Sequence, residues 1–273
     1  MTATFFDRLG ERIRSADSVL SVGLSPDLGR LPDAVADYDY PRRAFNRRII
    51  DATHDHVAAY TANLASYEDS AGWISLAETV AYAEGKGVPV VLDGKRADIG
   101  NTSEQYAKAL DSADAVTVNP YLGEDALAPF FDREERGVFV TCRTPNSGAR
   151  NIQGRELASG ETVAERVAEM VEKWADDAAA DVGLLVGGDS ETVEILREQV
   201  ELPFLVVGGA RNDPEVAEYA LADGVGLVDA SREVIYASES VGANRGYSRD
   251  DDAFAAPARQ AARRLKRQLN RYR

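Results

Sequence analysis

The chain has 273 residues, which is long for a typical domain but matches one α/β barrel, and 44% of them are hydrophobic. Acidic residues outnumber basic ones by 46 to 31, so the net charge of −15 repels nucleic acids and anionic membranes, and we expect neither as a partner. The sequence has no apolar run of membrane-spanning length and no leader-like start, which predicts a cytoplasmic protein.

Apolar runs of strand length alternate with longer segments of helical period along the whole chain, which is the pattern of repeated βα units. We predict strands at 18–24, 57–64, 88–93, 115–119, 137–142, 182–186, 204–208 and 226–229. We predict helices at 41–54, 76–85, 103–110, 161–178, 190–198 and 214–222, with a C-terminal helix at 254–272.

This alternation predicts an α/β protein with a closed (β/α)8 barrel, the TIM barrel, in which residues 1–273 form a single domain. A polar surface loop is expected near 241–252, before the C-terminal helix. An open, doubly wound sheet is the alternative, and the lack of a Gly-x-Gly-x-x-Gly sequence after the first strand disfavours it.

Charged residues follow the third predicted strand in the sequence Asp93-Gly94-Lys95-Arg96-Ala97-Asp98. In a barrel the active site forms where the strands end, and side chains two apart on a strand share a face, so Asp93 and Lys95 should point together into the mouth. A lysine beside a carboxylate stays protonated and can donate that proton. The spacing also fits an ion-pair cluster that closes the barrel rim, and spacing alone does not decide between the two.

Motifs at successive strand ends resemble the longer bacterial and archaeal branch of the orotidine 5'-phosphate decarboxylase family. They are Gly23-Leu24 with Pro26-Asp27, the Asp93 to Asp98 sequence continued by Ile99-Gly100-Asn101-Thr102, the run from Thr117 to Gly123, Cys142-Arg143-Thr144, and Ser231-Arg232. The resemblance therefore extends over essentially the whole chain.

The resemblance implies decarboxylation of orotidine 5'-phosphate to UMP in de novo pyrimidine biosynthesis, without cofactor or metal. It implies that Asp93 lies against the departing carboxylate, that Lys95 protonates a carbanion at C6, and that Asp98 acts across a homodimer interface together with Ile99 and Thr102. The other substrate-binding positions that it implies are Ser25, Thr61, Pro145, Ser147, Gly208, Gly209, Arg211 and Arg232.

Four strand ends depart from the family pattern. Ser25 stands where the family has an aspartate, and Thr61 stands where it has a lysine. In Thr144-Pro145-Asn146-Ser147-Gly148 the serine and proline positions of the family are exchanged, and the loop at 207–213 is shorter than the family's phosphate loop. Arg211 is expected to substitute for the missing glutamine of that loop.

These departures leave two alternatives open. One is a catalytically silent homologue that binds a nucleotide or phosphosugar. The other is a Mg²⁺-dependent phosphosugar lyase of the same superfamily, which would need an acidic residue near position 61, where Glu68 and Asp69 are the closest downstream candidates. Finally, an acidic chain with only five lysines is typical of halophilic proteins, although an acidic mesophilic protein has the same signature.

Overall fold

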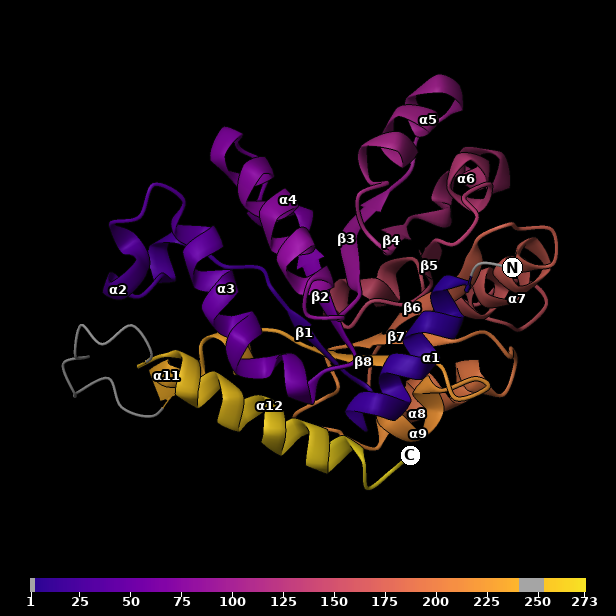
Figure 1. Ribbon diagram of the computed structural model, residues 1–273. Coiled ribbons are helices and arrows are strands. Elements are labelled where there is room, and N and C mark those ends of the chain that lie inside the picture. Colours follow the sequence, from indigo (N-terminus) through magenta and orange to yellow (C-terminus); the bar gives the residue numbers. More distant parts are fainter. Residues whose placement is uncertain (1–2, 241–252) are drawn as a thin grey trace.

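The computed structural model describes residues 3–240 and 253–273, so the surface loop predicted near 241–252 lies outside the described residues. Eight parallel strands close into a barrel in sequence order, with β8 paired to β1 (Figure 1). This confirms the predicted fold class. The strands are β1 (Leu20–Gly23), β2 (Ala59–Asn63), β3 (Val90–Arg96), β4 (Ala115–Val118), β5 (Gly137–Thr141), β6 (Asp181–Gly187), β7 (Phe204–Val207) and β8 (Leu227–Ala230).

Helices surround the barrel, and most of them connect consecutive strands (Figure 1). In the described residues they are α1 (Phe5–Ala16), α2 (Asp33–Ala36), α3 (Pro41–Thr53), α4 (Ser70–Glu84), α5 (Gly100–Ala109), α6 (Glu124–Phe131), α7 (Val163–Ala175), α8 (Ser190–Arg197), α9 (Val216–Ala220), α10 (Arg232–Ile235), α11 (Ala237–Ser240) and α12 (Ala255–Leu269). None of them is both long and apolar enough to cross a membrane.

Two helices of eight or more residues, α1 and α6, lie outside the predicted set. Helix α1 begins at a capping box, in which Thr4 accepts from the Asp7 backbone N–H and the Asp7 side chain accepts from that of Thr4. Helix α6 contains Pro129, a residue that disfavours helix interiors, and it is only eight residues long.

Helix α1 covers the N-terminal ends of the strands. The Phe5 ring packs edge-on against Phe139 of β5 at 6.2 Å, and a Cβ at Gly137 would overlap it. The Phe6 backbone N–H donates to Asp181, the first residue of β6. Because α1 closes this end of the barrel, the C-terminal ends of the strands form its open mouth.

Candidate active site

Strand β3 carries the central pair of charges at the mouth. Its first three residues are buried, and accessibility begins at Asp93. The strand runs three residues beyond its predicted end, because Arg96 pairs with Val118 of β4 after a register shift. Lys95 lies in this irregular segment with φ of 48°, a left-handed conformation that costs a non-glycine residue about 1–2 kcal/mol. Strain of this kind is typical of functional sites.

Three donors from three adjacent strands fix the Asp93 carboxylate. Lys95 Nζ lies 2.6 Å from Oδ1, and the Thr117 hydroxyl donates to the same oxygen at 2.7 Å. Asn63 Nδ2 donates to Oδ2 at 3.0 Å. Thr117 also accepts from the Lys95 backbone N–H at 2.9 Å, so this buried hydroxyl holds the strained backbone and the carboxylate together. The predicted meeting of Asp93 and Lys95 is thus present, through an irregularity rather than through regular strand alternation.

Asp229, at the end of β8, is a second carboxylate in the mouth. Oδ1 accepts from the Thr61 hydroxyl of β2 at 2.6 Å, and Oδ2 accepts from the Ser231 hydroxyl at 3.0 Å. The pKa of Asp229 is raised to about 6. Burial and, to a smaller extent, the nearby charge of Asp93 raise this pKa, and the hydrogen bonds from Thr61 and Ser231 lower it. The Thr61 hydroxyl therefore donates to a carboxylate, and position 61 carries no positive charge.

The remaining residues predicted at the first three strand ends lie around this centre. The Ser25 hydroxyl accepts from the Asn63 backbone N–H at 2.9 Å and so links the ends of β1 and β2. Asp98 lies on the loop after β3, where its Oδ1 accepts from the Ile99 backbone N–H at 2.8 Å. Ile99 is 65% exposed, and Thr102 lies exposed in the first turn of α5.

A cavity of about 370 Å³ lies over the ends of β5, β6 and β7 and brings together four predicted residues, namely Pro145, Ser147, Gly208 and Gly209. Pro145 packs so closely on Gly187 and Gly208 that a Cβ on either glycine would crowd its ring. Arg143 and Arg150 also line the cavity. Its two acidic residues, Asp189 and Asp213, accept from backbone N–H groups at the start of α8.

Arg211 and Arg232 lie outside this cavity. Arg211 follows β7 in an exposed turn, and Arg232 is the exposed first residue of α10 after β8. Neither forms an ion pair within residues 3–240 and 253–273, so both guanidinium groups are open to an anion from solvent.

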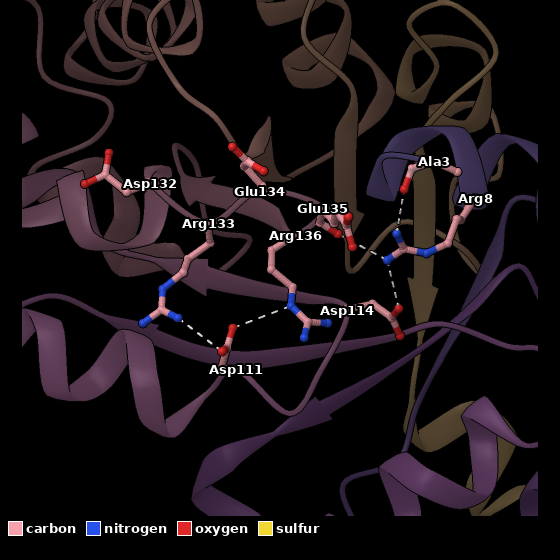
Figure 2. A pocket seen from close by; sticks show the side chains of 9 residues that line it. All are labelled: Ala3, Arg8, Asp111, Asp114, Asp132, Arg133, Glu134, Glu135 and Arg136. Atoms are coloured by element: carbon pink, nitrogen blue, oxygen red, sulfur yellow. Dashed lines mark hydrogen bonds and ion pairs between the residues drawn. The ribbon is translucent and has the colours of Figure 1, made fainter. Parts of the chain in front are cut away.

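A larger cavity, of about 750 Å³, lies at the opposite end of the barrel, and Figure 2 shows the side chains that line it. Arg8 of α1 forms an ion pair with Asp114, the residue before β4. Asp111 forms ion pairs with Arg133 and with Arg136, and Arg136 is the residue before β5. Because these residues lie before the strands, they join loops on the N-terminal face, where barrels keep residues that serve stability.

Four polar residues of the mouth were absent from the predicted site, namely Asn63, Thr117, Asp229 and Ser231. Asn63 is the last residue of β2 and Thr117 the last but one of β4, the two strands that flank β3. Polar residues near the ends of neighbouring strands are therefore the sequence signal that could have identified both. Asp229 meets Thr61 only across the closed barrel, and no local sequence pattern links the two residues.

A closed (β/α)8 barrel with a lysine–carboxylate pair at the C-terminal ends of its strands is the architecture of a TIM-barrel enzyme. Residues 36–247 match the family model described as orotidine 5'-phosphate decarboxylase / HUMPS family. The orotidine 5'-phosphate decarboxylase of Halorubrum lacusprofundi is 54% identical, over 99% of this chain and 100% of that protein. That of Haloarcula marismortui is also 54% identical, over 98% and 99%.

The comparison with solved structures points to the same family as these relatives. A structure of Leishmania donovani OMP decarboxylase matches with a TM-score of 0.79 at 33% identity, covering 98% of each chain. The chain belongs to the orotidine 5'-phosphate decarboxylase / HUMPS family. The haloarchaeal origin of the two relatives also agrees with the halophile-like composition.

Proposed function

We propose that this protein is a carbon–carbon lyase that decarboxylates orotidine 5'-phosphate to UMP in de novo pyrimidine biosynthesis, using neither cofactor nor metal. The observation that carries the proposal is the Lys95–Asp93 pair, held by Thr117 and Asn63 at the barrel mouth. The support for this particular reaction comes from two relatives of that name, each 54% identical over nearly the whole chain.

In the proposed reaction, Asp93 lies against the substrate carboxylate and Lys95 lies beside C6 of the pyrimidine. The bond between C6 and the carboxylate breaks, CO₂ leaves, and the electron pair stays on C6. Lys95 stabilises this charge and transfers a proton from Nζ to C6, and it regains a proton from water. The ammonium favours charge that develops only in the transition state, which is the condition for catalysis rather than mere binding.

The substrate is held by groups on both sides of the mouth. Gly208, Gly209, Arg211 and Arg232 would hold the phosphate, because barrels commonly bind phosphate with the loops after strands seven and eight. Pro145 and Ser147 would border the base, and Ser25 and Thr61 would lie beside the ribose. A substrate that carries a phosphate stays inside the cell, so we propose that the enzyme is cytoplasmic.

The enzyme would act as a homodimer of single-domain subunits, with Asp98, Ile99 and Thr102 completing the neighbouring subunit's site. Ile99 is 65% exposed, and Tyr121 and Leu122, on the loop after β4, are 82% and 44% exposed. Apolar side chains of this size beside a polar mouth fit a subunit interface.

One observation favours a second function. Thr61 supplies no cation, so among the described residues Lys95 is the only lysine at the mouth, and removal of a charged transition-state contact typically costs about 10²–10³ in rate. The second function is therefore nucleotide binding without turnover. The Mg²⁺-dependent lyase has less support, because Glu68 pairs with Arg96 and Asp69 pairs with Arg42 and caps α4.

The test is the loss of absorbance as orotidine 5'-phosphate becomes UMP, followed in molar KCl with EDTA. Turnover by the wild type should fall by at least about 10²-fold in Lys95→Ala, because the proton donor is gone. Lys173→Ala, which changes an exposed lysine of α7, is the matched control and should retain full activity. Binding of UMP without any turnover would establish the second function instead.

A further inference from the structure

Asp229 is a carboxylate at the mouth that the proposed proton transfer does not use. Each of its oxygens accepts one hydrogen bond, from Thr61 at 2.6 Å and from Ser231 at 3.0 Å. Within the described residues no lysine, arginine or histidine forms an ion pair with it. The two oxygens of a carboxylate offer about four acceptor positions, so acceptor capacity remains for a ligand.

The surroundings of Asp229 fix its orientation. Thr61 is buried, and it lies opposite Gly23 in the register of β1 and β2. A Cβ at Gly23 would overlap the Ser231 hydroxyl, so glycine at this position is what allows Ser231 to reach Asp229. Two hydroxyls from separate segments of the chain thus hold one carboxylate.

The charges near Asp229 restrict what it can bind. The charged group near Asp229 is Asp93 of β3, which is itself paired with Lys95. The other neighbouring strands present uncharged groups, namely the hydroxyls of Ser21 on β1 and Thr61 on β2 and the side chain of Val207 on β7. Two neighbouring carboxylates repel an anion. This repulsion excludes an anionic group. Since a nucleoside monophosphate carries no cationic group, the part of it that meets Asp229 must be a neutral hydrogen-bond donor.

The position of Asp229 identifies that donor. It lies on β8, with the Lys95 pair to one side of it and Arg232 three residues further along the chain. In a nucleoside monophosphate the sugar lies between the base and the phosphate, and carboxylates are common acceptors for ribose hydroxyls.

We infer that Asp229, positioned by Thr61 and Ser231, is a substrate-binding residue that accepts a hydrogen bond from a ribose hydroxyl of the nucleotide. This inference rests on the proposed function, because it takes a nucleotide as the ligand. It assigns Thr61 a role as a positioning residue, in place of the cation that the family has there.

The test compares the dissociation constants of UMP, 2'-deoxy-UMP and 3'-deoxy-UMP, measured by calorimetry in molar KCl. The wild type should bind at least one deoxy analogue about tenfold more weakly than UMP, because a hydrogen bond to a charged acceptor is lost. In Asp229→Asn this ratio should fall to about threefold or less. Asp132→Asn, which makes the same change at an exposed position at the end of α6, is the matched control and should keep the wild-type ratio.

Two further measurements separate positioning from folding. Thr61→Val should lower the same ratio and Thr61→Ser should restore it, because only serine keeps the hydroxyl. The ratio of the two dissociation constants in the wild type should also decrease from pH 7.5 to pH 5, because Asp229 takes up a proton in this range. All three ligands carry the same phosphate, so the titration of the phosphate cancels in this ratio.

Equal affinities of the wild type for UMP and both analogues would overturn the inference and leave the proposed function standing. The same ratio in Asp229→Asn as in Asp132→Asn would also overturn it. No binding of UMP by the folded wild type would overturn the proposed function, and this inference with it.

Discussion

At the scale of single residues, the position of Asp229 at the mouth lowers the stability of the fold when its carboxylate is ionised. Burial raises its pKa from 3.8 to about 6, so the folded protein holds this proton more tightly than the unfolded chain. The group therefore stabilises the fold most below pH 3.8, and this contribution is lost as the pH rises through about 6. At pH 7.5 the ionised carboxylate costs about 3 kcal/mol, from a shift of about two pKa units.

Asp229→Asn removes this cost, because an amide stays neutral. We expect its free energy of unfolding to exceed that of the wild type by about 2–3 kcal/mol at pH 7.5 and by about half as much at pH 5. Urea denaturation at the two pH values, in one fixed concentration of KCl, measures both differences. A gain that does not change with pH would mean that the charge of Asp229 is not its source.

At the scale of elements, the end of β1 and the segment after β8 meet at Gly23 and Ser231. We expect Gly23→Ala to lower the free energy of unfolding by about 1–3 kcal/mol, because the added methyl group overlaps the Ser231 side chain. Ser231→Gly makes room for it, so the two changes together should destabilise less than the sum of their separate effects. Strictly additive effects in denaturation experiments would show that the contact is not tight.

The strands and their contacts also show how much of the structure could be predicted from the sequence. All eight strands were predictable, because a buried parallel strand needs a short apolar run and the chain has one for each. Asp93 and Lys95 were predictable from their place at the end of the third apolar run. The bulge at Lys95 was not, since it depends on how β3 pairs with β4, and the contact of Thr61 with Asp229 was not, since barrel closure joins residues 168 positions apart.

At the scale of the whole molecule, the proposed dimer must bring together two chains of net charge −15, so it needs salt to screen their repulsion. We expect Ile99→Asp to sediment as a monomer in molar KCl and to lose turnover, because Asp98 would no longer reach a neighbouring site. Ile195→Asp, at a 45% exposed position on α8, is the control and should remain a dimer. A fully active monomer of either variant would contradict the shared site.

The reaction itself gives the most direct test of the whole account. Orotidine 5'-phosphate would be incubated with a stoichiometric amount of the wild-type protein in D₂O containing molar KCl and EDTA, and the product would be examined by NMR. We predict UMP that carries deuterium at C6, because Lys95 exchanges its protons with solvent and transfers one to the carbanion. Unchanged orotidine 5'-phosphate in the presence of folded protein would contradict the account and leave a nucleotide-binding barrel without turnover.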